Sequence, residues 1–525
     1  MSSAVVPPEV PAEQRAGGRE SFRRGAAFNS LSFLVIAVFG FVSSIATARL
    51  YGASVIGQFA LVMAPVEALW FLSSIREQAA LVRELTSLPP RAARVTGLFA
   101  AVMLFSSGLT GLVALIAGVL TVILFNGPID HPDLIAPALL SLAAYTFITN
   151  VGWNLDAVFS AFVAGRQLFW IRAHQAVAFV IVAVVWSVFD TTVWGLIAAT
   201  YVSALTSLLH RVLSVRRFMR LRVPIAQIRS GLTALPDMLR FGAKIAPGSI
   251  FEGLSQQIPT WVLGATSSLA SVGAFNRAQG FSGRLSILNL RVGEMLFPVL
   301  VARHGADDRP GFDRAFVDTA RYVLVTLLLI ASVCAGAAAG VMSLFGPGFA
   351  RAATAFGFLM FMPPVLTLGS VQMHALIAVG RPGMTSLTAM CRLVATLALV
   401  PLLVAAVGPT GAAVALLTGA VLDAALKSRA LRRHLNAPWH VIWPRVQVLA
   451  LVAACCLAFF VAHVVDAAVG HPGGLLITLS AGSIAYMGVI VVWGLNERDR
   501  NRLAPVVVRL PRPLRRPVGM LLKTT

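Results

Sequence analysis

Long apolar runs, separated by short polar or basic segments, dominate the chain. Three of them, at 25–48, 95–125 and 472–495, each exceed twenty residues without a single Asp, Glu, Lys or Arg. A helix needs roughly 20 consecutive apolar residues to cross a membrane. Delimiting each run by its polar, Gly and Pro breakers predicts about fourteen spanning helices, at 26–48, 55–78, 95–124, 134–163, 169–188, 192–214, 243–266, 275–301, 321–344, 354–379, 385–406, 411–430, 446–466 and 474–495.

The chain also repeats itself at an offset of 215 or 216 residues. Three separated matches share this offset: Gly57-x-Phe59 with Gly273-x-Phe275, Gly165-Arg166 with Gly380-Arg381, and Gly195 plus Arg216-Arg217 with Gly411 plus Arg432-Arg433. The repeat unit contains six helices, and an even number inserts both units in the same orientation. The pattern therefore predicts an all-α polytopic membrane protein with two parallel six-helix lobes, a cleft between them, and a C-terminal helix pair.

These elements divide the chain into six predicted parts. They are a basic N-terminus (1–25), an N-lobe (26–214), a linker (215–242), a C-lobe (243–433), an extra helix pair (444–495) and a basic tail (496–525). Because Pro224 and Pro236 interrupt the linker, we expect short amphipathic pieces on the membrane surface there.

Charge and composition narrow the functional class. The net charge of +21 would suggest nucleic acid in a soluble chain, but only 12% of the residues are charged and 58% are hydrophobic. The arginines concentrate in alternate connections and at both ends, so the positive-inside rule places both termini in the cytoplasm and no nucleic acid partner is expected. The four cysteines all fall inside apolar spans, which indicates neither a disulfide nor a metal site. No cofactor is predicted.

Short motifs at the helix ends carry a family resemblance. They are Ala48-Arg49-Leu50-Tyr51-Gly52, Gly57-Gln58-Phe59 and Ala164-Gly165-Arg166. With the two six-helix lobes, they resemble the bacterial polysaccharide flippases of the O-antigen and teichuronic-acid type, within the multidrug/oligosaccharidyl-lipid/polysaccharide exporter superfamily. The fourteen-helix count is similar to that of the lipid II flippases, whose added helix pair forms a lipid-binding groove.

The resemblance implies a function. It is the translocation of a lipid-linked saccharide, typically carried on undecaprenyl pyrophosphate, from the inner to the outer leaflet of the bacterial inner membrane by alternating access. The expected partners are the substrate, membrane lipids and glycosyltransferases or a polymerase of the same surface-polysaccharide pathway.

Ionisable residues inside the apolar runs are the candidate substrate-binding groups, because each is costly in a membrane. Arg277, Arg284 and Arg291 recur every seven residues in the predicted helix 275–301, and seven residues complete two turns to within about 20°. The three form one basic stripe, and guanidinium groups suit the oxygens of a pyrophosphate. Alternatively, Arg277 and Arg291 extend to the membrane surface.

Three further charged residues are substrate-site candidates. Glu252 matches the depth of Arg291 and Glu294, so we expect it to pair with one of the three arginines, either within a binding site or as a fixed structural ion pair. Arg49, at the outer end of the first helix, either guards the exit of the cleft or binds lipid phosphates.

Asp156, Glu67 and His374 are candidates for carrying a coupling ion, because each can titrate within an apolar run. The alternative is that they are interhelical hydrogen-bonding groups, as are Gln256, Gln257, Arg392 and Asp423.

Two other functions compete with the flippase. A cation-coupled multidrug antiporter of the same superfamily would favour acidic pockets, but the helix at 26–48 contains no acid. A lipid II flippase remains open. An enzyme is disfavoured, because the outer connections are short and no HExxH, P-loop or GxSxG motif is present.

Overall fold

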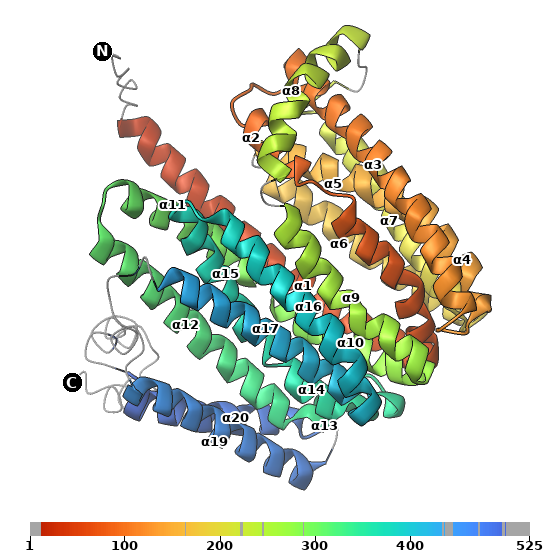
Figure 1. The fold of residues 1–525 in the computed structure, drawn as a ribbon, viewed down its shortest axis with the longest axis vertical. Helices are drawn as coiled ribbons and strands as arrows, with labels where there is room; N and C mark the ends of the chain where they lie inside the picture. Colours follow the sequence, from red (N-terminus) through yellow and green to blue (C-terminus); the bar gives the residue numbers. More distant parts are fainter. Residues whose placement is uncertain are drawn as a thin grey trace.

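The computed structural model describes residues 12–162, 164–220, 224–243, 246–286, 288–432, 435, 445–470, 473–495 and 499; within these ranges the side chains of 12–37, 241, 288–291, 294 and 445 are not described. This part of the chain is helical and contains no strand. Most of the long helices run side by side across the molecule (Figure 1).

The first lobe comprises α1 to α7. These helices are α1 (Ala12–Leu72), α2 (Glu77–Leu85), α3 (Ala93–Asn126), α4 (Ile135–Leu140), α5 (Thr146–Ala161), α6 (Gly165–Ser187) and α7 (Val193–Val215). A π-helical turn, Ser141–Tyr145, joins α4 to α5. Helix α8 (Ile225–Ala243) then connects the lobes. We call the end of the molecule that carries α8 the linker end, and the opposite end, where Gly52 lies, the Gly52 end.

The second lobe comprises α9 to α17. These helices are α9 (Ala246–Thr266), α10 (Leu269–Leu285), α11 (Leu288–Gly305), α12 (Arg309–Gly336), α13 (Ala338–Ser343), α14 (Ala353–Leu359), α15 (Met362–Ala378), α16 (Pro382–Val407) and α17 (Pro409–Leu431). The pair α19 (Arg445–Val469) and α20 (Leu475–Val489) packs against α12.

Eleven helices of the described chain are long and apolar enough to cross a membrane. The first, Val38–Leu72, is two helices in one, because Gly52 has φ +74°, a backbone angle that glycine adopts without strain. The more polar α9 and α10 lie among these spans (Figure 1) without being among the eleven. The prediction of an all-α polytopic membrane protein is confirmed.

Glycine contacts at the Gly52 end reveal an approximate two-fold axis between the lobes. A Cβ on Gly57 would lie 1.9 Å from the carbonyl oxygen of Leu269, and a Cβ on Gly273 would lie 1.9 Å from that of Ala53. Adding 216 to Ala53 and Gly57 gives Leu269 and Gly273, so each contact is the repeat image of the other. Such reciprocity is the mark of a two-fold axis.

Helix positions carry the same repeat. Helices α7 and α17 are both 23 residues long, and their first residues, 193 and 409, are 216 positions apart. Across the axis, the part of α1 before Gly52 packs along α10, and the part after Gly52 packs along α9. These are two copies of one interface.

Two sequence expectations are wrong. The predicted helix 275–301 is broken, since α10 ends at Leu285 and α11 begins at Leu288. The closely spaced Gly280, Gly283 and Ser286 weaken the helix just before the break. The linker expected as short pieces forms the single helix α8, which continues through Pro236. Glycines at its contact with α3 let the two backbones pack closely and support α8 despite the lost hydrogen bond.

Candidate functional site

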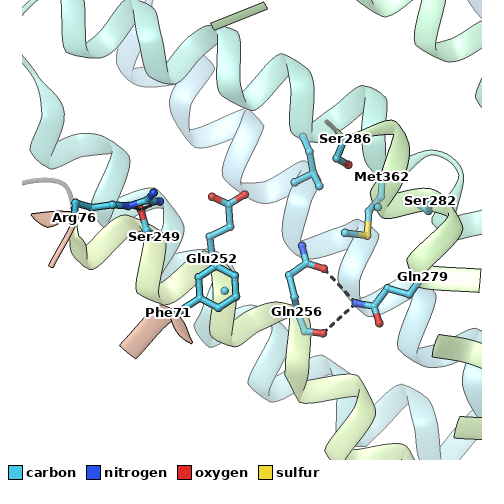
Figure 2. A pocket seen from close by; sticks show the side chains of 12 residues that line it. Phe71, Arg76, Ser249, Glu252, Gln256, Gln279, Ser282, Ser286 and Met362 are labelled. Carbon is cyan, nitrogen blue, oxygen red and sulfur yellow. Dashed lines mark hydrogen bonds between the residues drawn. The ribbon is translucent and has the colours of Figure 1, made fainter. Parts of the chain in front are cut away.

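A polar cavity of about 360 Å³ lies between the lobes, towards the linker end. Phe71 and Arg76 line it from the first lobe, and α9, α10 and α15 line it from the second (Figure 2). At the Gly52 end the lobes instead touch through the glycine crossing of α1 and α10. The more polar helices α9 and α10 therefore both contribute polar side chains to this cavity.

Glu252 occupies the cavity wall with its carboxylate directed inward (Figure 2). Its Oε1 lies 3.6 Å from Nη1 of Arg392 on α16; the glutamate side chain is 56% exposed and the arginine side chain 2%. Nε and Nη2 of Arg392 have no hydrogen-bond partner among the described residues. In the described part of the chain no ion pair joins Glu252 to Arg277 or Arg284, and the expected pairing with one of the three arginines stays a prediction for Arg291, whose side chain lies outside the described part.

Arg76 links the lobes at the mouth of the cavity. Its Nε donates to the hydroxyl of Ser249 on α9 at 3.0 Å, and Nη2 donates to the same oxygen. The residue adopts a left-handed backbone, φ 57°, in the turn between α1 and α2. A non-glycine residue held in this conformation needs support from its surroundings.

Amide side chains connect the remaining walls. Gln279 of α10 donates to the side-chain oxygen and to the backbone carbonyl of Gln256 at 3.2 and 3.0 Å (Figure 2). Gln257 donates to Oε2 of Glu67 at 2.7 Å. This second bond joins α9 to α1, and therefore one lobe to the other.

Arg277 and Arg284 lie on the face of α10 that packs against the first part of α1. Nη1 of Arg277 donates to the hydroxyl of Ser44 at 3.1 Å, and Nε of Arg284 lies 3.7 Å from the position of a Cβ on Gly40. In the described structure no carboxylate pairs with either, and Nε of Arg277 and Nη1 of Arg284 are buried without a partner. A buried, unneutralised guanidinium is costly, so this site favours an anion.

The internal repeat shows that only one of the two equivalent helix interfaces carries this arginine pair. The equivalent positions of α1, 216 residues earlier, hold Leu61 and Ala68, both buried and apolar. At these two positions one copy of the interface is apolar and the other basic. The expected three-arginine stripe does not lie on one helix, since Arg291 follows the break in α11. The side chains of Arg291 and Glu294 lie outside the described part.

The other candidate residues take separate positions. Arg49 donates from Nε to the carbonyl oxygen of Leu344 at 2.7 Å, which ties α1 to the second lobe at the Gly52 end. Asp156 pairs with Arg211, with 2.8 Å between Oδ1 and Nε. Nδ1 of His374 lies 2.7 Å from the carbonyl oxygen of Ser370. No described group of three or more His, Cys, Asp or Glu residues could hold a metal ion.

Arg76, Arg211 and Lys427 are polar groups that the sequence interpretation missed. Lys427 donates to Asp423 at 2.6 Å within α17, and this i, i+4 spacing is a signal that could have revealed the pair. Arg76 and Arg211 sit near the ends of apolar runs, where arginines usually mark a membrane boundary. Their partners come from other helices and leave no local signal.

Comparison with known proteins places the chain in a family. A family model described as polysaccharide biosynthesis protein matches residues 22–304, more than half of the sequence. The chain belongs to the polysaccharide biosynthesis protein family. A search of curated proteins found no significant match.

Solved structures show the fold of this family member to be shared. It is similar to the lipid II flippase MurJ in an inward closed conformation, with a TM-score of 0.67 and 12% identity, covering 88% of this chain and 98% of that one. It is also similar to an inward-facing multidrug resistance MATE family transporter of the MOP superfamily, with a TM-score of 0.59 and 15% identity over 77% and 97% of the two chains. A Vibrio cholerae MATE transporter, VcmN, has a TM-score of 0.51 and 16% identity over 78% and 98%. The expected likeness in fold to the exporter superfamily is confirmed, and with its long apolar helices this family member is a multi-pass membrane protein.

Proposed function

We propose that this transporter is a flippase for a lipid-linked oligosaccharide, carried on undecaprenyl pyrophosphate, in cell-surface polysaccharide assembly. It acts in the bacterial inner membrane with both termini in the cytoplasm, and moves its substrate from the inner to the outer leaflet by alternating access. The substrate would come from glycosyltransferases of the same pathway and pass to its polymerase.

The unneutralised pair Arg277 and Arg284 is the observation that carries this proposal. Both guanidinium groups are held in a membrane helix with buried donor atoms that have no partner in the described structure. A cationic drug would be repelled there, whereas the phosphate oxygens of a lipid carrier would accept these donors. Arg291 and Glu294 follow on α11 and would extend the site towards the linker end.

The arrangement of contacts between the lobes supports alternating access. The lobes touch at the Gly52 end through the glycine crossing and Arg49, while the cavity lies towards the linker end. With the linker end in the cytoplasm, the cavity lies on the inner-leaflet side, and the Arg76–Ser249 contact at its mouth would open to admit substrate. The polar walls around Glu252 and Gln256 would then bind sugar hydroxyls.

Glu67 is the best placed of the three candidates for a coupling proton. Its carboxylate accepts the interlobe hydrogen bond from Gln257, so protonation would change a contact between α1 and α9. Asp156 is already neutralised by Arg211, and His374 is engaged by a backbone carbonyl. We therefore propose Glu67 as the coupling residue, ahead of Asp156 and His374.

Deleting the gene tests the substrate class. We expect one lipid-linked oligosaccharide to accumulate on the inner leaflet, measured by mass spectrometry of extracted lipids, with loss of the corresponding surface glycan. Accumulation of lipid II would instead identify a lipid II flippase. Normal glycan export with raised sensitivity to cationic drugs would contradict the proposal and favour drug efflux.

Substituting Arg284 tests the site. Hydrogen bonds to charged groups contribute about 1.5–3 kcal/mol, so Arg284→Gln should lower translocation about ten- to hundredfold at unchanged abundance. Arg284→Lys should retain part of the activity, because it keeps the charge without the planar fork. Arg240→Gln, on the exposed face of α8, is the control and should be neutral. Unchanged transport in Arg284→Gln would contradict the assigned role.

A further inference from the structure

Five exposed arginines gather on the first lobe at the linker end. Arg91 and Arg94 precede and begin α3, and Arg216, Arg217 and Arg220 follow α7. The two loops are joined, since the amide of Arg91 donates to the carbonyl of Phe218 at 2.7 Å. We call these five residues the basic surface.

The basic surface lacks the acidic partners that surface arginines usually find. In the part of the chain that the structure describes, none of the five forms an ion pair with a carboxylate. Nη2 of Arg91 instead donates to the backbone oxygen of Arg216. Five like charges therefore remain close together and available to an anion.

In the second lobe, the loop equivalent to the one that carries Arg91 pairs its own charges, although Arg432 is the repeat equivalent of Arg216. Arg91 and Asp307 are 216 positions apart and share a left-handed backbone, with φ 63° and 50°. Asp307 pairs with Arg309 at 3.2 Å, and Asp308 pairs with Arg303. The amide of Gly311 and the Arg303 guanidinium lower the pKa of Asp308, which keeps this carboxylate ionised. The loop before α12 is therefore neutralised by its own carboxylates, whereas the loop before α3 is not.

Helix α8 adds exposed apolar side chains beside the basic surface. Ile225 is 73% exposed and Leu232 38% exposed, and Arg229 is also exposed. A Cβ on Gly231 would lie 2.1 Å from the carbonyl oxygen of Gly97, so α8 packs tightly against α3 (Figure 1). The apolar residues are thus fixed to the same lobe as the arginines.

We propose that the basic surface and α8 bind the headgroups of anionic phospholipids in the leaflet at the linker end. The arginines stand where the spanning helices α3 and α7 end, which is the depth of lipid phosphates, and basic residues there attract anionic headgroups. Exposed Ile225 and Leu232 suit the boundary between headgroups and acyl chains better than the surface of an acidic soluble protein. This property does not depend on which substrate is transported, and it anchors the first lobe more firmly than the second.

Lipid association of the purified full-length protein tests the proposal. After reconstitution into phosphatidylcholine bilayers, electron spin resonance would measure the binding of spin-labelled phosphatidylglycerol relative to spin-labelled phosphatidylcholine. The wild type should prefer phosphatidylglycerol, and 0.5 M salt should weaken the preference by screening. Because basic residues near an anionic surface attract its headgroups, changing all five residues to Gln should lower the preference about tenfold or more.

Matched variants keep the test specific. Changing the five residues to Lys preserves the charge and should preserve the preference. Arg303→Gln with Arg309→Gln removes two paired arginines at the same end of the second lobe and should have little effect. If the five-residue Gln variant does not fold, Arg216→Gln with Arg217→Gln should still lower the preference severalfold. The proposal is overturned if the wild type shows no preference, if the folded Gln variants keep it, or if the second-lobe variant loses it equally.

Discussion

Each lobe contains a buried cation at the same repeat position, and the two lobes neutralise it with carboxylates from different helices. Lys427 is the repeat equivalent of Arg211, 216 positions earlier, and both are buried. Arg211 pairs with Asp156 on α5, but the equivalent of Asp156 in the second lobe is Gln372. Lys427 pairs instead with Asp423 on its own helix. Each lobe therefore retains a neutralised cation, because a buried charge without a partner is strongly destabilising.

Removing Lys427 from its ion pair with Asp423 should destabilise the second lobe. Lys427→Met leaves the carboxylate of Asp423 buried without its cation, and breaking a buried pair in this way costs about 3–5 kcal/mol. We expect a clear fall in the unfolding temperature of the detergent-solubilised protein. The double variant Asp423→Asn with Lys427→Met should recover part of that loss, since no charge is left unpaired. The exposed Arg432→Gln serves as control; equal stability of Lys427→Met and wild type would contradict the interpretation.

At the scale of elements, small residues decide where helices meet and where they end. Gly57 and Gly273 allow α1 and α10 to cross with their backbones in contact. Near the linker end of α10, Gly283 and Ser286 line the cavity at the point where the helix breaks before α11. The same helix thus closes one end of the lobe interface and opens the other.

A methyl group at the crossing should separate the two helices. In Gly273→Ala the new Cβ would lie 1.9 Å from the carbonyl oxygen of Ala53, so backbone must move. Overpacking of this kind costs about 1–3 kcal/mol, and we expect a lower unfolding temperature together with reduced transport. Gly280→Ala, on the same helix with nothing within 4 Å, should be neutral or slightly stabilising. Equal effects of the two substitutions would show that the crossing is not tight.

On the scale of the whole molecule, the structure is one state of a two-lobed membrane protein, which we propose to be a flippase. The lobes meet closely at the Gly52 end, and the cavity at the linker end is bridged at its mouth by Arg76 and Ser249. Arg49, bonded to Leu344, spans the lobes at the closed end. Under alternating access these contacts must break in turn.

Weakening the contact of Arg49 should shift the protein towards the state that opens at the Gly52 end. Arg49→Ala removes the hydrogen bond to Leu344, and a net loss of about 0.5–1.5 kcal/mol would raise that population roughly two- to tenfold. The measurement is the labelling rate of Ser286→Cys by a membrane-impermeant thiol reagent applied from the Gly52 side, with the four native cysteines replaced by serine. Arg351→Ala, an exposed arginine at the same end, is the control. No increase in labelling would argue against a gating role for Arg49.

Several features of this protein depend on local patterns and could be predicted from consecutive residues. Apolar length gave the spanning helices, a common offset of about 216 residues gave the repeat, and charges inside the spans pointed to Arg277, Arg284 and Glu252. Periodicity within a helix is a local property and is written in consecutive residues.

Which of these residues contact one another depends on how the helices pack. Glu252 pairs with Arg392, 140 positions away, and Arg76 with Ser249, 173 positions away, while Arg277 and Arg284 face α1 across the lobe interface. The break before α11 is also a property of the fold. The two-fold axis shows that Arg277 and Arg284 occupy the positions that Leu61 and Ala68 hold in the other lobe. Such pairings follow from how whole helices pack. Because the packing energy is distributed over residues far apart in the chain, no local sequence pattern predicts which residues pair.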